Sequence, residues 1–209
     1  MASEIMLPLI GCFALAATIP QNPNPWVSMG ESNGTKIWQR EVASSSIQEI
    51  KVETTIDASS VHIWRVIRDV ERYAEFMPYL AEARILWEQG DTRLVYQRIS
   101  PPLFNDRDYT LRAKAYEDYE TGVFEQTFSE ANAQGPPPRD GTVRVGTVDG
   151  GWVLEPLGPS KTRIVYWLHT DPGGVVPQWA VNFGQRRSLP KLLKALRQVV
   201  TRPVGPADR

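Results

Sequence analysis

The stretch GGWVLEPLGPSKTRIVYWLHTDPGGVVPQWAVNFGQRRSLPKLLKAL, residues 150–196, decides the fold of this chain. Its first half contains two runs of β-branched and aromatic residues, 152–157 and 162–170, separated by the turn sequence Gly-Pro-Ser-Lys. Runs of this kind around a short turn are typical of a β-hairpin. The sequence Asp-Pro-Gly-Gly at 171–174 follows the second run. We therefore expect two paired strands followed by a sharp corner.

The second half of the stretch predicts a long amphipathic helix that closes the protein. Pro177 suits its first turn, where proline is favoured. Pro190 falls inside the helical pattern and removes one backbone donor, so we expect a kink at that point. Basic residues lie on one face of the helix. The face toward the protein, recognised by its helical spacing, consists of Val181, Gln185, Ser188, Leu192, Leu196 and Val199.

Upstream of this stretch, hydrophobic periodicity predicts one further helix and several strands. Residues 59–77 have the helical period, and residues 57–60 supply a cap. The segment that begins at Trp26 predicts a short helix or loop. Short turns separate the later strands, so consecutive strands should pair antiparallel. The expected result is an α+β fold in which a meander of strands grips the C-terminal helix; these strands are 36–42, 49–56, 83–88, 93–99, 108–116, 123–130 and 142–148.

The composition limits the class of function. A chain of 209 residues suits one domain with a sizeable core, and a net charge of -1 gives no electrostatic reason to expect nucleic acid. Cys12 is the only cysteine, which argues against a disulfide framework or a thiolate metal site. His62 and His169 are isolated from each other in the sequence. We therefore expect neither a metal nor a cofactor.

The amino terminus is almost uninterrupted apolar sequence from Ile5 to Ile19, which is shorter than the roughly 20 residues of a spanning helix. It resembles the core of a signal peptide, and residues 9–12, Leu-Ile-Gly-Cys, have the form of a bacterial lipoprotein box. Glu4 and the lack of an early Lys or Arg argue against a signal. Two interpretations stay open: an exported, periplasmic protein, including a form anchored by lipid at Cys12, and a cytoplasmic protein with a packed amino-terminal helix. We assign residues 1–25 to this segment and a linker, 26–203 to one domain, and 204–209 to a tail.

Several short motifs carry a resemblance to a known family. These motifs are Ile67-Arg68-Asp69-Val70-Glu71-Arg72-Tyr73, Phe76-Met77-Pro78, Arg107-Asp108-Tyr109, Gly150-Gly151-Trp152 with Pro156-Leu157, Lys161-Thr162-Arg163 and Asp171-Pro172-Gly173-Gly174. Over residues 36–200 the chain resembles a START domain, the lipid-binding branch of the helix-grip superfamily. It is similar in particular to bacterial START-like proteins, many of which begin with an export signal, and this favours export here.

The resemblance implies a curved antiparallel sheet wrapped around the long C-terminal helix, with an internal hydrophobic tunnel for one lipid molecule. Periodicity alone leaves an ordinary filled core as a second interpretation. The family's cavity positions fall on single strand faces of this chain and are largely apolar, with a few neutral hydrogen-bonding groups. They correspond to Gln97, Ile99, Tyr109, Leu111, Ala113, Phe124, Gln126, Val145, Thr147, Trp152, Tyr166, Gln185, Ser188 and Leu192.

The resemblance also bears on the kind of lipid. Sterol carriers of the family place an acidic and a basic side chain in the cavity, at positions that correspond to Gln97 and Ala113 here. The charged pair is therefore absent, and a phosphate would lack an obvious Arg or Lys partner. The amide of Gln97 or Gln126 can still bind a hydroxyl group. We expect a neutral or weakly polar lipid rather than a phospholipid.

Three functions remain open: a noncatalytic carrier or sensor of a lipid, an enzyme like the aromatases and cyclases of the same superfamily, and a module that binds a protein partner through a filled core. We expect the carrier, as a monomer that contacts membranes transiently, with Trp179 and Phe183 as candidate contacts. Arg107 and Asp108 are interpreted as anchors of a strand start rather than catalytic residues, because adjacent residues of a strand point to opposite faces. His169 is interpreted as structural, because no Ser or Cys motif and no carboxylate constellation accompanies it.

The way into the tunnel is expected between the loop 131–141 and the start of the final helix. This loop, ANAQGPPPRDG, contains prolines that stiffen it, glycines that can act as hinges, and no large apolar residue to hold it down.

Overall fold

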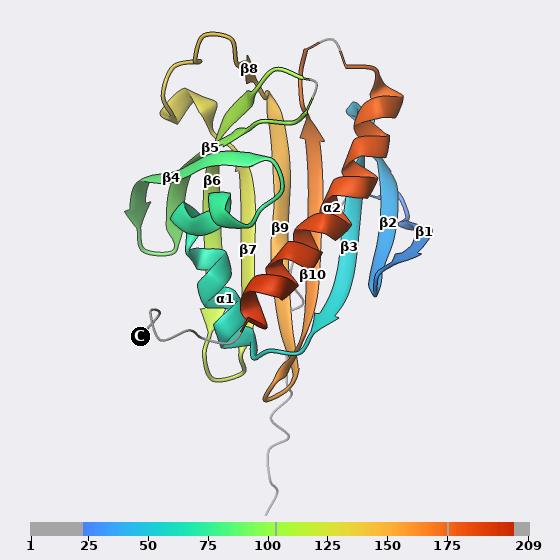
Figure 1. Ribbon diagram of the computed structural model, residues 1–209, viewed down its shortest axis with the longest axis vertical. Helices are drawn as coiled ribbons and strands as arrows, with labels where there is room; N and C mark the ends of the chain where they lie inside the picture. The colour runs from blue at the N-terminus through green and yellow to red at the C-terminus, as the bar shows by residue number, and fades with distance from the viewer. Residues whose placement is uncertain (1–22, 103, 175, 203–209) are drawn as a thin grey trace, which may run out of the picture.

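The structure is a computed structural model that describes residues 23–102, 104–174 and 176–202 (Figure 1). The expected tail and nearly all of the expected leader, including Cys12, lie outside these residues. In the described part of the chain, no helix is long and apolar enough to cross a bilayer. The elements are β1 (Val27–Ser32), β2 (Thr35–Val42), β3 (Ser45–Ile56), α1 (Ser60–Arg68), the 3-10 helix η1 (Val70–Glu75), β4 (Leu80–Gln89), β5 (Thr92–Ile99), β6 (Arg107–Asp118), β7 (Val123–Glu130), the 3-10 helix η2 (Asn132–Gln134), β8 (Val143–Arg144), β9 (Thr147–Gly158), β10 (Lys161–Asp171) and α2 (Gln178–Val200).

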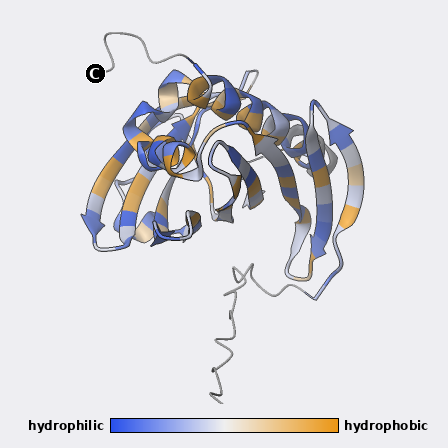
Figure 2. Cartoon of the chain, turned by 90° about the horizontal axis from the view of Figure 1, so that it is seen from below, coloured by the Kyte–Doolittle hydropathy of each residue, from blue (hydrophilic) through white to orange (hydrophobic). Residues whose placement is uncertain are grey.

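The strands form one sheet in the order β1-β2-β3-β10-β9-β7-β6-β5-β4, and neighbours in this order pair antiparallel. The short strand β8 lies beside β6 and is parallel to it. β3 pairs with β10, so the first strands of the chain meet its last hairpin in the middle of the sheet. Figure 1 shows α2 running obliquely across one face of the sheet toward α1, and Figure 2 shows the curvature of the sheet. The predicted helix-grip arrangement is confirmed.

The core lies between this face of the sheet and the two helices. Trp64 and Ile67 of α1 and Leu193 and Leu196 of α2 are almost completely buried in one cluster with residues of β3, β7, β9 and β10. α2 is helical throughout Gln178–Val200 and continues past Pro190. Its most buried residues differ in part from the predicted face and are Val181, Gln185, Leu189, Leu193, Leu196 and Val200.

The single helix predicted over residues 59–77 is wrong, because α1 ends at Arg68 and a separate 3-10 helix follows. Ser59 caps the start, where its Oγ accepts a hydrogen bond from the backbone N–H of His62 at 3.3 Å. At the other end, the Tyr73 hydroxyl donates to the carbonyl of Ile67, and Arg93 Nη1 donates to the carbonyl of Arg68 at 2.6 Å. Side chains therefore donate hydrogen bonds to carbonyl groups that would accept from backbone N–H groups in a longer helix.

The loop or short helix predicted from Trp26 onward is also wrong, because residues 27–32 form β1. β1 and β2 are joined by Asn33-Gly34, whose φ angles of 52° and 71° are those of a tight hairpin turn. The strand gains its hydrogen bonds from β2, a partner that the local pattern of β1 does not reveal.

A strand over residues 142–148, separate from the last hairpin, is a third wrong prediction. β9 instead runs without a break from Thr147 to Gly158, through Gly150 and Gly151. A Cβ atom at Gly150 would lie 2.6 Å from the ring of Phe128, and one at Gly151 would lie 2.4 Å from the ring of Trp167. The two glycines are therefore strand residues over which neighbouring aromatic rings pack, one on each face.

Candidate functional site

A cavity of about 370 Å³ lies between the sheet and α2. This volume falls within the usual range of small-molecule sites, roughly 300–1,000 Å³. Its walls come from η1, from β4, β5, β6, β7, β9 and β10, and from the first half of α2, and most of the side chains are apolar. The described residues thus leave a space between the sheet and α2, in the region where the START resemblance implies a tunnel.

All but two of the predicted site residues line this cavity. They come from β5, β6, β7, β9 and β10, from the segment between β8 and β9, and from α2, and the structure brings them together around one space. These residues are Gln97, Ile99, Tyr109, Leu111, Ala113, Gln126, Val145, Trp152, Tyr166, Gln185, Ser188 and Leu192.

Phe124 was predicted on the cavity wall and lies outside it. Its ring stacks on Trp64 of α1, with ring centroids 5.4 Å apart. It also makes an edge-to-face contact with the ring of Tyr119, with centroids 5.1 Å apart. The alternation that links Phe124 to Gln126 is correct, since both point to the helix side of the sheet. The cavity ends before it reaches Phe124, because α1 fills that space.

Thr147 is the second residue that does not line the cavity. Val145 and Thr147 would share a face in a continuous strand. The chain leaves extended pairing at residues 145–146, between β8 and β9, and the alternation is out of phase afterwards. Val148 therefore lines the cavity in place of Thr147.

Sequence reasoning missed a larger group of lining residues. Some continue an alternation that was already identified: Val95 precedes Gln97 by two, Arg107 precedes Tyr109 by two, and Phe128 follows Gln126 by two. Others belong to turns and loops, for which the sequence carries no periodic signal. The missed residues are Val70, Tyr73, Met77, Pro78, Tyr79, Leu80, Val95, Pro101, Phe104, Arg107, Phe128, Val148, Leu168, Thr170, Pro172, Val176, Val181, Gly184 and Leu189.

Most polar groups on the wall are neutral and are hydrogen-bonded to each other. The Tyr109 hydroxyl donates to Gln97 Oε1 at 3.0 Å, and Gln185 Nε2 donates to the carbonyl of Thr170 at 2.8 Å. Burial raises the pKa of Tyr109 to about 12 and raises the pKa of Tyr166 as well. Both phenols therefore stay protonated at physiological pH and can act only as neutral hydrogen-bonding groups.

Arg107 is the exception, because it brings a positive charge to an otherwise neutral wall. It lines the cavity and is only 4% exposed. The premise that the cavity offers no Arg or Lys to a phosphate is therefore wrong, and the preference for a neutral lipid loses this support. Arg107 begins β6 and shares a face with Tyr109, Leu111 and Ala113, whereas the next residue, Asp108, points to the other face.

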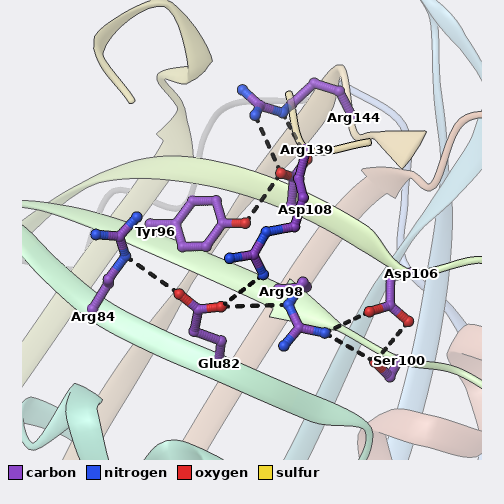
Figure 3. Close-up of polar contacts among 9 residues, drawn as sticks. All are labelled: Glu82, Arg84, Tyr96, Arg98, Ser100, Asp106, Asp108, Arg139 and Arg144. Atoms are coloured by element: carbon purple, nitrogen blue, oxygen red, sulfur yellow. Dashed lines mark hydrogen bonds and ion pairs between the residues drawn. The ribbon is translucent and has the colours of Figure 1, made fainter. Parts of the chain in front are cut away.

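The outer face of the same strands carries a network of charged side chains (Figure 3). Asp108 is fully buried and accepts hydrogen bonds from Arg144 Nε at 2.7 Å, from Arg144 Nη2 at 3.2 Å and from the Tyr96 hydroxyl at 3.1 Å. Asp106 is held by Arg98 and by Ser100, whose hydroxyl donates at 2.7 Å. Asp108 thus ties β5, β6 and β8 together, in agreement with its interpretation as a structural residue.

Two connections at the same end of the sheet, at the top of Figure 1, contribute to the cavity wall, and we call this end of the cavity its mouth. Pro101 and Phe104 belong to the connection between β5 and β6, and Pro172 and Val176 to the connection between β10 and α2. Phe104 is 52% exposed although it lines the cavity. Val181, near the start of α2, also lines the cavity, whereas the side chains of Trp179 and Phe183 lie outside the described part of the structure.

The loop 131–141, predicted as the other side of the entrance, does not line the cavity. It is held against the outer face of the sheet. Asn132 Oδ1 accepts from the backbone N–H of Thr110 at 2.9 Å, and Asn132 Nδ2 donates to the carbonyl of Val145 at 2.7 Å. A Cβ atom at Gly135 would lie 1.8 Å from Thr110 Oγ1, so the loop packs directly on the strand. The loop contains no large apolar residue, but polar contacts and close packing hold it in place.

Comparison with known proteins adds information on the fold and the family. The family model described as polyketide cyclase / dehydrase and lipid transport matches residues 56–197. Phosphatidylcholine transfer protein of Mus musculus is 22% identical over 174 residues, which are 81% of this chain and 80% of that protein. A STAR-related lipid transfer protein fragment from Xanthomonas axonopodis is 25% identical, with a TM-score of 0.76 over 85% of this chain and 99% of that chain. An aromatase/cyclase from Streptomyces, 21% identical, has a TM-score of 0.57 over 76% of this chain and 96% of that chain.

Proposed function

Because the chain belongs to the polyketide cyclase / dehydrase and lipid transport family, we propose that it binds one lipid molecule in the cavity between the sheet and α2 and transfers it unchanged between membranes. The START resemblance deduced from short motifs is confirmed by this family match and by the similarity to a STAR-related lipid transfer protein.

The single observation that carries the proposal is the chemistry of the cavity wall. Apolar side chains make up most of it, and its phenols and amides are neutral. Among the described lining residues, none is Asp, Glu, His, Lys or Cys. A wall of this kind favours burial of a long hydrocarbon chain. It offers no carboxylate or imidazole as a general base and no thiol as a nucleophile, which supports a carrier over an enzyme.

Exposed apolar residues at the mouth support transfer by brief contact with a membrane. Phe104 and Tyr79 are 52% and 42% exposed, and both also line the cavity. Lys191 Nζ lies 3.5 Å from the Tyr79 hydroxyl, so a cation accompanies the aromatic ring. Aromatic rings beside a lysine suit the boundary between lipid tails and anionic head groups. The lipid then enters and leaves without crossing water.

Mass spectrometry of material extracted from the purified native protein tests this proposal, together with transfer of labelled lipid between vesicles. We expect one lipid per chain and recovery of chemically unaltered label after transfer. An altered product would instead support the aromatase/cyclase function, for which the family description and the structural similarity to an aromatase/cyclase are the reasons. A protein that extracts nothing and transfers nothing would point to the third candidate, a module that binds a protein partner.

We further propose that residues 1–25 direct export, so that the lipid is carried outside the cytoplasm by a monomer. Cell fractionation of the full chain, compared with a Cys12→Ser variant, tests both export and lipid anchoring. Recovery of both forms in the cytoplasm would contradict export.

A further inference from the structure

We infer that Arg107 binds the anionic oxygen atoms of a lipid head group, a carboxylate or a phosphate, with the hydrocarbon chain directed toward Trp152 and Tyr166. The inference rests on the proposed function, because it names the chemical class of the lipid that the same cavity takes. It replaces the expectation of a neutral ligand, which assumed a wall without a cation.

The first support is the burial of a charge without a counter-ion. Arginine stays protonated in proteins, and burying its charge is unfavourable unless the charge is paired. Arg107 is 4% exposed, and no described residue forms an ion pair with it. Its position on the cavity wall leaves the cavity as the place where an anion can meet it.

The second support is the pattern of its hydrogen bonds. Arg107 Nη1 donates to the carbonyl of Asn105, which holds one side of the guanidinium group. The Nε atom is buried and has no hydrogen-bond partner in the structure. The described residues give neither Nε nor Nη2 a hydrogen-bond acceptor, and the edge that these two atoms form matches the two oxygen atoms of a carboxylate or phosphate.

Neighbouring carboxylates do not compete for this edge. Asp108 points to the opposite face of β6 and is occupied by Arg144 and Tyr96, as Figure 3 shows. Asp106 is occupied by Arg98 and Ser100. The charges flanking Arg107 in sequence are therefore neutralised among themselves on the outer face, and the charge of Arg107 remains for the cavity.

The place of Arg107 in the cavity fixes the orientation of the lipid. Its guanidinium Cζ lies 5.3 Å from the ring centroid of Phe104, at the mouth. Ala113, on the same face of β6, lies deeper, beside Gln126 and Phe128 of β7. At about 3.3 Å per residue, the wall from Arg107 to Ala113 is about 20 Å long, enough for an extended acyl chain. The head group then sits at the mouth and the chain fills the apolar interior.

The experiment compares three probes that share one oleoyl chain: oleate, oleoyl lysophosphatidate and methyl oleate. We expect the intact protein to bind at least one of the two anions more tightly than methyl oleate. Arg107→Met should weaken binding of that anion about 10- to 100-fold, the range for a charged hydrogen-bonded contact, and leave methyl oleate within about threefold. Arg107→Lys should keep part of the preference, because it keeps the charge but not the two-pronged geometry.

The matched control is Arg112→Met, on the same strand but on the exposed outer face, where the arginine contacts Gln134. Its affinities should equal those of the intact protein. Retained binding of methyl oleate by Arg107→Met shows that its cavity is folded. A preference for oleate identifies a carboxylate as the natural head, and a preference for lysophosphatidate identifies a phosphate.

Two results overturn the inference while leaving the proposed function intact. One is equal affinity of the intact protein for methyl oleate and both anions, and the other is identical behaviour of Arg107→Met and Arg112→Met. If none of the three probes binds to the intact protein and no lipid is extracted with it, the proposed function and the inference both fail.

Discussion

Trp152 of β9 and Tyr166 of β10 stand at paired positions of the sheet, and their ring centroids lie 4.2 Å apart. Both rings line the cavity, although the two residues are only 3% and 7% exposed. The pair is therefore part of the core and part of the cavity wall at once. Substitutions of these two residues should therefore weaken binding more, and lower the free energy of unfolding less, than substitutions in the closed core.

Replacement of Trp152 by Ala is expected to weaken lipid binding about tenfold and to lower the free energy of unfolding by less than the roughly 3 to 5 kcal/mol typical of a core Trp. The reason is that one side of the indole faces the cavity and has fewer partners to lose. Trp64→Ala is the control, since Trp64 is equally buried but lies outside the cavity and stacks on Phe124. Urea denaturation and titration with lipid measure both quantities; unchanged affinity of folded Trp152→Ala would assign the ring to the core alone.

Replacement of Phe104 by Ser should slow lipid transfer between vesicles several-fold, by a larger factor than it weakens equilibrium affinity, because the exposed ring would lose its contact with the bilayer. Tyr116→Ser serves as the comparison. Tyr116 is 50% exposed but does not line the cavity, and its replacement should leave transfer unchanged. Equal transfer rates for the two variants would place the membrane contact elsewhere.

Gly135→Ala tests the corrected position of the entrance. The added methyl group would overlap Thr110 Oγ1, at 1.8 Å, so the loop 131–141 must shift. We expect the free energy of unfolding to fall by about 1 to 3 kcal/mol, as for other overpacked sites, with lipid uptake and release rates unchanged. Faster exchange of lipid in this variant would restore the loop as part of the entrance.

Asp108→Asn should destabilise the protein by roughly 3 to 5 kcal/mol, because it leaves the charge of Arg144 without its buried partner. Asp106→Asn removes a carboxylate of the same network that is accessible to solvent, so its effect should be clearly smaller than that of Asp108→Asn. Chemical denaturation at neutral pH compares the two. Similar, small losses would mean that Asp108 is not needed to hold β6 and β8.

The ion pair between Glu53 and Arg163 on β3 and β10 makes part of the stability depend on pH. The hydrogen bond from Arg163, at 2.9 Å, lowers the pKa of the Glu53 carboxyl below its ordinary value of 4.5, partly offset by desolvation. The folded state therefore holds this proton less tightly than the unfolded chain. The stabilisation is complete above pH 4.5 and is lost as the pH falls through the lowered pKa.

Because Arg163 is partly exposed, the contribution of this pair should be at most about 1 kcal/mol. Glu53→Gln should lower stability by this amount at pH 7, and the difference from the unmodified protein should vanish toward acid pH. Thermal denaturation of both proteins as a function of pH measures it. A constant difference at all pH values would contradict the role of ionisation.

The alternation of side chains predicted much of the site, because alternate residues stay on the same face along a regular strand. Gln97, Tyr109 and Leu111 lie on the cavity side for this reason, and Arg107 would have been found by following the same alternation two residues back. The prediction failed where regularity ends. Thr147 was misplaced because the break at 145–146 changes the phase, and Phe104 belongs to a connection without any period.

The remaining errors have long-range causes. α1 ends at Arg68 because Tyr73 and Arg93 bind its last carbonyls, and Arg93 comes from a strand that follows later in the chain. Gln126 lines the cavity whereas Phe124 does not, because the position of α1 decides where the space stops. Such contacts are properties of the assembled fold, and a local pattern of residues does not contain them.

Gly150 of β9 helps to set the shape of the cavity although it is not itself part of the wall. Phe128 occupies the space where a side chain at Gly150 would stand, and its ring forms part of the cavity wall. A Cβ atom at 150 would lie 2.5 Å from the backbone oxygen of Trp167 and 2.6 Å from the ring of Phe128, so a larger residue must shift β10 and displace a ring that lines the cavity. One methyl group added at this position of a central strand would thus change the shape of the pocket from behind its lining, with every lining residue unchanged.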